Sequence, residues 1–386
     1  MLALFKSLPD DGSYNVGDKL IGESAAEFID DITDERVVSY YDVDELLEDI
    51  DLINESKALL IAAFGIRSSI WRPKLADAIV DGSIGVPVVP LASAWSDFPG
   101  DYEQLTSENY PQYDRSVVQF YQYVAKHAPA VSSRDYYTQK ALEGLDISSR
   151  MVGDCAWYDL ESLGEKMCKP EKIDKLVVTD PHQSQYFDQA ESLMSELGGM
   201  FPDAEKLFCT HGDPSQSPKR QELASNANKY GFEKKDVSGD VSNISFYSDC
   251  DLHVGYRVHG HVGFLRKRRP SVLLCEDGRG LGFTETLGGC GFPAFTRRVP
   301  EASSTPKKIL QTFPEGTIHQ LQRKYLGGDR VSHPTTPARD DVVDQVTDFI
   351  HQELTTGWHR YEMIPAVIDE TYEREMKPFI REISNI

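Results

Sequence analysis

The 386-residue sequence lacks any apolar run close to the roughly 18 residues that a membrane-spanning helix needs. Its first residues, MLALFKSLPDDG, have no basic start and too short an apolar run for a signal peptide, so we expect a first strand there. Its six cysteines are scattered, without a CxxC pair or a zinc-like spacing. These absences favour a cytoplasmic protein with reduced thiols, no membrane span and no metal centre. They leave peripheral membrane association open.

Basic residues are also scarce. Lys and Arg number 40 against 62 Asp and Glu, which gives a formal charge of −22. Such acidity argues against general affinity for nucleic acid or anionic lipid. It is also compatible with a salt-rich habitat. Any anionic ligand would need a local pocket of positive charge.

The order of predicted elements indicates the fold class. Apolar strands, such as Ala58–Phe64 and Lys175–Thr179, alternate with helices along most of the chain, a pattern typical of parallel sheets. A chain of this length exceeds what one core usually holds. We therefore expect an α/β protein with two Rossmann-like, doubly wound parallel-sheet domains facing a cleft. The predicted divisions are 1–165, 172–345 and a helical tail, 346–386.

One stretch organises the second domain. A short strand, Leu252–Tyr256, is expected to end in Arg257, His259 and His261, with a helix following from about Val258 to Arg268. Pro270 ends that helix before a buried strand, Ser271–Cys275. Open α/β sheets bind ligands outside the carboxyl ends of their strands, and helix N-termini favour anions. These side chains therefore indicate an anion site.

The order of Arg-x-His, helix, apolar strand, Glu276-Asp277 and Leu-Gly resembles the second half of the polysaccharide pyruvyl transferase family. Two upstream stretches fit the same resemblance: Asn15-Val-Gly-Asp18, and Val131-Ser-Ser-Arg-Asp135 followed by Val152-Gly-Asp154. The resemblance implies a fold similar to GT-B glycosyltransferases and a tail that crosses back to the first domain. It also implies transfer of pyruvate from phosphoenolpyruvate onto hydroxyls of a sugar, forming a ketal. The acceptor would be a cell-surface glycan or its lipid-linked precursor, as in exopolysaccharide biosynthesis.

The resemblance points to Arg134, Arg257 and His259 as catalytic residues. Arginine suits both the phosphate and the carboxylate of phosphoenolpyruvate, so Arg134 and Arg257 are expected to hold this co-substrate from opposite domains. Histidine is the residue type whose charge changes most readily near neutral pH, so His259 is the predicted general acid or base. The scheme requires no metal or other cofactor.

Other candidates each have a structural alternative. His182 follows a strand and His261 follows His259 on a different helical face, so both are weaker donor-binding candidates than Arg257. Four residues beside predicted strand ends or the first helix are acceptor candidates: Asn15, Asp18, Trp71 and Trp95. Asp18 is also expected to cap the first helix. Glu276 and Asp277 either act as a base toward the sugar or orient Arg257. The basic run Arg266–Arg269 is expected to be structural.

Two other functions remain open from the sequence. A GT-B glycosyltransferase would use a nucleotide sugar, with the Arg/His pocket holding its diphosphate. A catalytically silent relative would instead act as a binding protein in glycan assembly. Titration with each donor distinguishes these alternatives.

Overall fold

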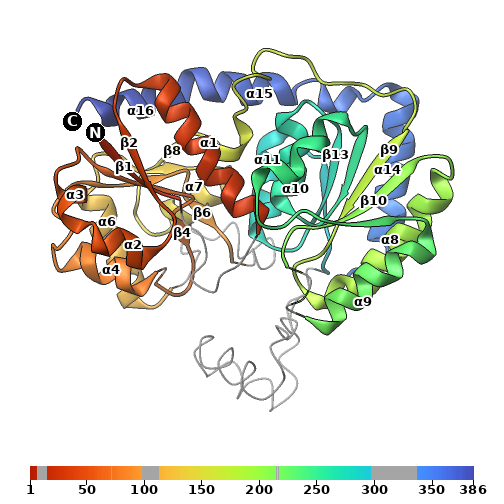
Figure 1. The fold of residues 1–386 in the computed structure, drawn as a ribbon, viewed down its shortest axis with the longest axis horizontal. Coiled ribbons are helices and arrows are strands. Elements are labelled where there is room, and N and C mark those ends of the chain that lie inside the picture. The colour runs from red at the N-terminus through yellow and green to blue at the C-terminus, as the bar shows by residue number, and fades with distance from the viewer. Residues whose placement is uncertain (7–14, 71, 98–112, 214, 216, 297–336) are drawn as a thin grey trace.

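The computed structural model describes the chain except residues 7–14, 71, 98–112, 214, 216 and 297–336. Trp71 and the helix predicted from Pro314 to about Leu326 lie outside the described residues. Two bodies stand side by side in Figure 1, and helices of the C-terminal segment run along the top of both. We call the bodies the N-terminal half (β1 to η1) and the C-terminal half (β9 to β14).

The N-terminal half is built on a four-stranded parallel sheet in the order β2-β1-β3-β5. Its central strands, β1 and β3, consist of fully buried apolar residues, as expected for a sheet covered on both faces. Two further ladders of two residue pairs each join β4 to β6 and β7 to β8. The strands are β1 (Leu2–Phe5), β2 (Val37–Tyr40), β3 (Leu59–Ala62), β4 (Gly65–Ile66), β5 (Val88–Leu91), β6 (Ala94–Trp95), β7 (Ser132–Ser133) and β8 (Arg150–Met151).

The helices of this half connect successive strands. Asn15 caps the first of them: its side chain accepts a hydrogen bond from the Gly17 amide, at 3.2 Å. The expectation that Asp18 is the cap was therefore wrong, because Asp18 already lies inside the first turn. The helices are α1 (Val16–Ile32), α2 (Val43–Glu48), α3 (Ile50–Asn54), α4 (Pro73–Val80), α6 (Arg115–His127), α7 (Tyr136–Glu143) and the 3₁₀ turn η1 (Cys155–Trp157).

The C-terminal half has six parallel strands in the order β11-β10-β9-β12-β13-β14. Numbered within this half, the order is 3-2-1-4-5-6, which is that of a Rossmann fold, and the strand order reverses between β9 and β12. The predicted fold class is thus confirmed. The strands are β9 (Lys175–Thr179), β10 (Glu205–Thr210), β11 (Glu233–Asp236), β12 (Leu252–Gly255), β13 (Ser271–Cys275) and β14 (Gly291–Pro293). The helices are η2 (Ser184–Tyr186), α8 (Phe187–Met200), α9 (Pro218–Asn226), η4 (Ala227–Tyr230), η5 (Val241–Asp249), α10 (Val258–Arg266) and α11 (Gly278–Leu287).

The C-terminal segment contacts both halves. The Nε1 of Trp358 donates to the carbonyl of Pro170 at 2.8 Å, and near the end of the chain Lys57 donates to the carbonyl of Ser384 at 2.7 Å. Arg150 forms ion pairs with Glu375 and Glu382, at 2.7 and 3.0 Å. The elements are α14 (Val342–Thr356), η6 (His359–Tyr361), α15 (Ile364–Thr371), η7 (Tyr372–Met376) and α16 (Lys377–Ser384).

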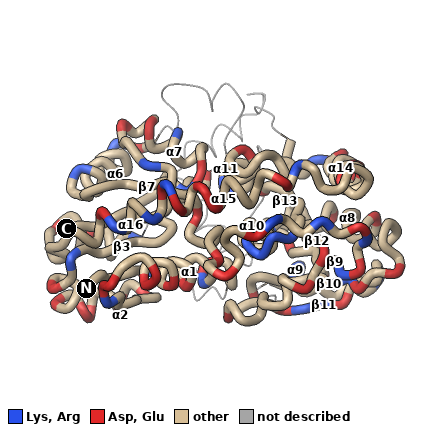
Figure 2. The backbone as a smooth tube through the Cα atoms, turned by 90° about the horizontal axis from the view of Figure 1, so that it is seen from above, with Lys and Arg blue, Asp and Glu red and all other residues tan. Residues whose placement is uncertain are grey.

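The basic run Arg266–Arg269 at the end of α10, blue in Figure 2, contacts segments on both sides of the boundary between the halves. Arg266 is buried and donates to Ser24 of α1 at 2.7 Å and to the carbonyl of Tyr158 at 2.9 Å. Arg268 pairs with Asp369 of α15 at 2.5 Å. The run therefore has a structural role, as predicted, but it acts by bridging segments rather than only by complementing the helix dipole.

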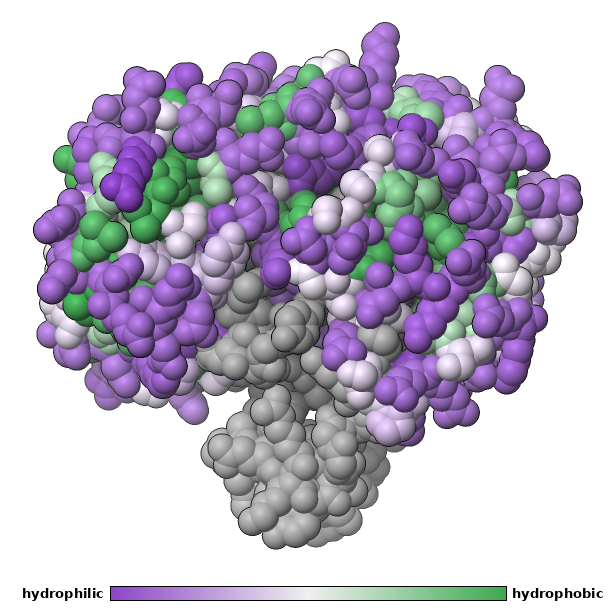
Figure 3. All heavy atoms as spheres, viewed as in Figure 1, coloured by the Kyte–Doolittle hydropathy of each residue, from purple (hydrophilic) through white to green (hydrophobic). Residues whose placement is uncertain are grey.

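No described helix combines the length and hydrophobicity needed to cross a membrane. The face seen in Figure 3 is mostly hydrophilic, with hydrophobic residues in small separate patches. All six cysteines are unpaired, and five of them are buried.

Candidate active site between the two halves

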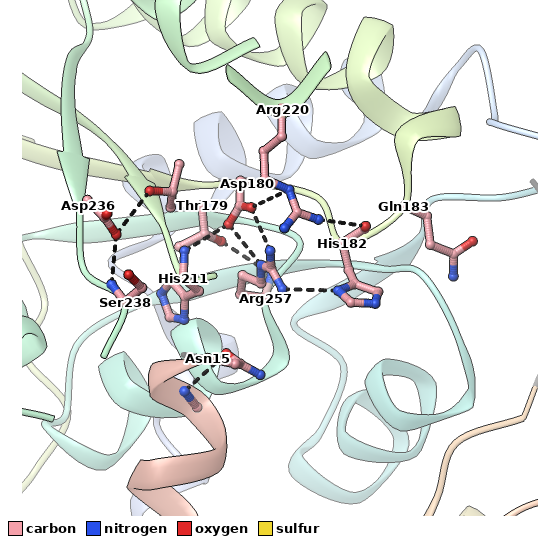
Figure 4. A network of polar contacts seen from close by, with 12 residues as sticks. Asn15, Thr179, Asp180, His182, Gln183, His211, Arg220, Asp236, Ser238 and Arg257 are labelled. Carbon is pink, nitrogen blue, oxygen red and sulfur yellow. Dashed lines mark hydrogen bonds and ion pairs between the residues drawn. The ribbon is translucent and has the colours of Figure 1, made fainter. Parts of the chain in front are cut away.

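An arginine–aspartate pair occupies the point where the strand order of the second sheet reverses. Asp180 follows β9 and Arg257 follows β12, and these strands are neighbours. Two parallel hydrogen bonds join them: Arg257 Nε to Asp180 Oδ1 at 2.8 Å and Nη2 to Oδ2 at 2.5 Å (Figure 4). Burial raises the pKa of Asp180, but the charges of Arg257 and Arg220 outweigh it, and the pKa lies below its usual value. The pair fixes the orientation of the Arg257 guanidinium.

Three further groups surround this pair. The Nδ1 of His182 lies 3.4 Å from Arg257 Nη1, and Arg220 donates to the His182 carbonyl at 2.9 Å. The carboxylate of Glu276 accepts the amides of His182 and Gln183, each at 2.9 Å. Of the two roles expected for Glu276, these contacts favour positioning, since they hold the loop that carries His182 beside Arg257.

Titration of Glu276 should make stability depend on pH. Burial is the main reason that its pKa rises from 4.5 to about 7, against the lowering effect of its two amide donors and Arg257. The folded state therefore holds a proton that the unfolded state has lost, and this stabilisation is complete below about pH 4.5 and gone above about pH 7. We expect the free energy of unfolding of the wild type, measured by urea denaturation, to fall by about 3 kcal/mol between these pH values. In Glu276→Gln this part of the pH dependence should be absent. An equal change of the unfolding free energy with pH in the two proteins would contradict the assignment.

The start of α1 reaches across to the C-terminal half. The Val16 amide donates to the carbonyl of His211 at 3.2 Å, which brings Asn15 beside the Arg257 cluster (Figure 4). Asn15 Nδ2 donates to Asp18 Oδ2 at 3.1 Å. Burial raises the pKa of Asp18, although the nearby charges of His259 and Arg279 act in the opposite direction. Asn15 and Asp18 therefore border the same site as His259.

His259 and Arg134 share one carboxylate. Arg134 Nη1 lies 3.3 Å and His259 Nε2 lies 3.9 Å from Asp154 Oδ2, so residues of both halves meet at this atom. Arg134 Nε also donates to Asp135 at 3.1 Å, and its guanidinium lies 4.7 Å from the ring centre of Phe283. Burial raises the pKa of Asp154, but His259 and Arg134 lower it further, to below its usual value.

Two donor groups of this cluster, which comprises Arg134, Arg257 and His259, are not hydrogen-bonded within the part of the chain that the structure describes. Arg134 Nη2 and His259 Nε2 are both buried and have no hydrogen-bond partner among the described residues. A buried donor without a partner is costly, and such groups commonly face a ligand or an ordered water. The structure thus brings Arg134, Arg257 and His259 to one region and leaves polar groups there for an anion.

Gly17 lets the two halves approach at His259. A Cβ at this position would lie 2.7 Å from both Cβ and Nδ1 of His259. We expect Gly17→Ala to displace His259 and lower the turnover of the enzyme, measured with saturating substrates. Gly199→Ala is the matched control, because Gly199 also lies in a helix but a Cβ there would meet no atom of the described residues within 4 Å. If Gly17→Ala and Gly199→Ala have the same turnover, this contact does not position His259.

Two predicted contacts are corrected by burial. His261 is only 1% exposed, and its Nδ1 lies 2.7 Å from Ser271 Oγ, behind the site. Burial lowers its pKa to about 3, so it is a neutral core histidine. Trp95 is also 1% exposed. Its ring lies 2.7 Å from the position that a Cβ on Gly278 would take, and its Nε1 donates to the Tyr113 hydroxyl at 3.0 Å. The Trp95 ring therefore joins the halves and offers no open platform to a sugar.

Sequence reasoning did not select two important residues, Asp180 and Asp154, which orient Arg257 and His259. Arg279, which the sequence places with Glu276 and Asp277 at the border of the cleft, pairs with Asp277 at 2.6 Å while its side chain stays 38% exposed. Asp277 is the main reason that the pKa of Arg279 is raised, and Asp18 contributes. A usable signal was present for Asp180, because it follows β9 as Arg257 follows β12. Within the described ranges, no three His, Cys, Asp or Glu side chains are grouped to hold a metal ion.

Two Rossmann-like halves with a buried Arg/His cluster between them define a GT-B-like protein. Among solved structures it is similar to Anabaena HepE in complex with UDP-glucose, with 12% identity, a TM-score of 0.49 and coverage of 100% of this chain and 98% of the other. It is also similar to the UDP-GlcNAc 2-epimerase of Neisseria meningitidis bound to UDP-GlcNAc, with 10% identity, a TM-score of 0.39 and coverage of 91% and 99%. The fold assignment itself rests on the strand orders given above.

The model of one protein family, described as polysaccharide pyruvyl transferase, matches residues 15–274. That range runs from the cap of α1 into β13 and includes Arg134, Arg257 and His259. The chain belongs to the polysaccharide pyruvyl transferase family and is a transferase. No curated protein matches it significantly.

Proposed function

We propose that this transferase moves pyruvate from phosphoenolpyruvate onto two hydroxyls of a sugar, forming a ketal. The acceptor would be a saccharide of a cell-surface glycan or its lipid-linked precursor, and the reaction would take place in the cytoplasm. The observation that carries the proposal is the meeting of Arg134, Arg257 and His259 between the halves. Arg134 Nη2 and His259 Nε2 are buried there and have no hydrogen-bond partner in the described ranges.

Donor binding requires positive charge in a protein that is acidic overall. Phosphoenolpyruvate is a small trianion near neutral pH, and arginine forks bind phosphate and carboxylate groups well. Arg257 is held by Asp180 and Arg134 by Asp135 and Asp154, so both guanidinium groups are already oriented before a ligand arrives. The partly exposed Arg279 adds a third positive charge.

The reaction needs a proton and two hydroxyl groups. In the proposed sequence His259 delivers a proton to the methylene carbon of phosphoenolpyruvate, and C2 becomes an oxocarbenium-like centre. One sugar hydroxyl attacks C2, phosphate leaves, and the second hydroxyl attacks C2 in turn, while both hydroxyl protons are released. Asp154 stabilises the protonated imidazole before transfer, since opposite charges favour one another at 3.9 Å inside the protein. No cofactor besides the co-substrate enters this scheme.

The N-terminus of α1 is the proposed acceptor side. Asn15 and Asp18 lie against His259 and offer an amide and a carboxyl group, which hydrogen-bond well to sugar hydroxyls. A hydroxyl held there would be close to the donor, and such proximity contributes several kcal/mol to the lowering of a bimolecular barrier.

Isothermal titration with phosphoenolpyruvate and, separately, UDP-glucose tests the donor. We expect saturable binding of phosphoenolpyruvate only, and release of inorganic phosphate when a suitable sugar is added, observed by ³¹P NMR. Binding of UDP-glucose instead would make the protein a glycosyltransferase. Failure to bind either donor would favour a catalytically silent family member.

A further inference from the structure

A hollow lies beside the active site, along α1. It has a volume of about 370 Å³ and is lined by Lys19 and Glu23 of α1, by Tyr41, and by Asp240 and Val241 at the start of η5. The first three residues belong to the N-terminal half and the last two to the C-terminal half. The hollow therefore lies where the two halves meet, as does the catalytic cluster of Arg134, Arg257 and His259.

A buried lysine organises one wall of this hollow. Lys6 follows β1 and is only 5% exposed, although lysine is rarely buried. Its Nζ lies 3.1 Å from Glu23 Oε2 and 3.1 Å from the Tyr41 hydroxyl, which itself donates to Glu23 Oε1 at 2.6 Å. Gly22 allows this arrangement, because a Cβ there would lie 2.7 Å from Lys6 Cβ. The carboxylate of Glu23 and the ring of Tyr41 are thus held in place at the edge of the hollow.

The opposite wall is also polar and fixed. The carboxylate of Asp240 accepts the amide of Ser242 at 2.8 Å and its hydroxyl at 2.6 Å. Lys19 lines the same hollow, and its charge contributes to lowering the pKa of Asp240, after the two hydrogen bonds from Ser242. The hollow therefore offers carboxylate acceptors, an ammonium donor and an aromatic ring within one small volume.

We infer that this hollow is a second saccharide subsite, which binds the sugar unit next to the one that receives pyruvate. The inference rests on the proposed function, because it extends the acceptor side of the same site. Asn15 borders the catalytic cluster, and Lys19 of the hollow lies four residues further along the same face of α1, a rise of about 6 Å. That separation is comparable to the length of one pyranose unit, so a disaccharide spans both places.

The charge balance favours a neutral sugar over an anion. Lys6 and Lys19 are matched by Glu23 and Asp240, which gives a formal sum of zero around the hollow. A neutral pocket with fixed carboxylates would repel phosphate groups but accept hydroxyl donors, and a tyrosine ring packs on the apolar face of a pyranose. The donor site differs in having three arginine side chains, whose planar forks bind oxyanions well.

Acceptor titrations by saturation-transfer NMR test the subsite with defined probes. The probes are methyl β-glucoside, methyl β-galactoside, methyl β-cellobioside and methyl β-lactoside, each added to the full chain. We expect at least one disaccharide to bind about 10-fold more tightly than the monoglycoside of its non-reducing sugar, a difference of about 1.4 kcal/mol. Tyr41→Ala and Glu23→Gln should remove this difference without changing monoglycoside affinity. Tyr123→Ala, on α6 in the same half, is the matched control and should retain it.

Each outcome decides the inference. Equal affinity for disaccharides and monoglycosides, absence of disaccharide binding, or an unchanged preference in both Tyr41→Ala and Glu23→Gln would overturn the subsite. Tyr41→Phe keeps the ring and serves if the alanine variant fails to fold; it should weaken the preference by loss of the hydroxyl. Phosphoenolpyruvate titration of the same samples separates the two proposals. If the wild type does not bind phosphoenolpyruvate, the proposed function is overturned. If it binds phosphoenolpyruvate but shows no preference for disaccharides, only the subsite is overturned.

Discussion

Replacing His259 by glutamine is expected to lower the rate of pyruvyl transfer by about 10²–10⁴-fold, the usual contribution of general acid–base catalysis. Glutamine retains a hydrogen-bond donor of similar size but cannot supply a proton to the methylene carbon. Donor affinity should change much less, because the arginine forks remain. The comparison requires kcat from phosphate release and the Kd of phosphoenolpyruvate from calorimetry.

Asp154→Asn should show that the carboxylate acts through His259. Asparagine preserves the acceptor that caps η1, where Asp154 Oδ1 accepts the Ala156 amide at 2.8 Å, but it removes the negative charge shared by His259 and Arg134. The protonated form of the imidazole loses its partner, so we expect a lower kcat whose dependence on pH shifts to lower pH. The shift in the pH profile distinguishes this role from a purely structural one.

Asp159→Asn provides the control for Asp154. Asp159 is also buried and also pairs across the halves, with Arg266 and Lys267, but it lies outside the catalytic cluster. Asp159→Asn should reduce stability without shifting the pH dependence of kcat. If His259→Gln lowers donor affinity as much as turnover, or if Asp159→Asn shifts the profile as Asp154→Asn does, then His259 is a binding residue and not the proton donor.

The elements that the sequence predicted well are those with a strong local pattern. Lys175–Thr179 and Ser271–Cys275 form strands with the predicted bounds, since each is a continuous apolar run ended by polar residues. The strand Gly291–Pro293 was not predicted, because glycine and proline are depleted in strands and the segment has no periodicity. Its place at the sheet edge beside β13 is decided by tertiary packing.

The residues of the candidate site also differ in how far local sequence patterns could predict them. Arg257 and His259 could be chosen from their position after a strand, and the helical period correctly separated His261 from His259. For Trp95 the sequence left both packing and sugar binding open, because the residue it packs on, Gly278, belongs to the other half. The link between Asp154 and His259 was invisible for the same reason: local patterns indicate where each strand ends, but not which ends of two different sheets face one another.

The second large effect is expected when Arg257 is removed together with its partner. Arg257→Ala alone would remove the closest partner of the fully buried Asp180 and leave it only Arg220, at 3.6 Å, as a cationic partner, and the loss of a buried pair costs about 3–5 kcal/mol. That variant therefore confuses binding with folding. The double variant Arg257→Gln with Asp180→Asn replaces the ion pair by a neutral hydrogen-bonded pair of similar shape. We expect it to keep a melting temperature near that of the wild type.

Donor affinity should nevertheless fall in the double variant. A hydrogen bond to a charged group contributes about 1.5–3 kcal/mol, so phosphoenolpyruvate should bind about 10- to 100-fold more weakly by calorimetry. Arg150→Gln is the matched control, since Arg150 also forms carboxylate pairs but with Glu375 and Glu382 of the C-terminal segment. Wild-type affinity in the double variant would mean that Arg257 only supports the loop after β9. The anion would then have to be held by Arg134 and Arg279, which approach the cluster from opposite halves and whose side chains are not held by Asp180.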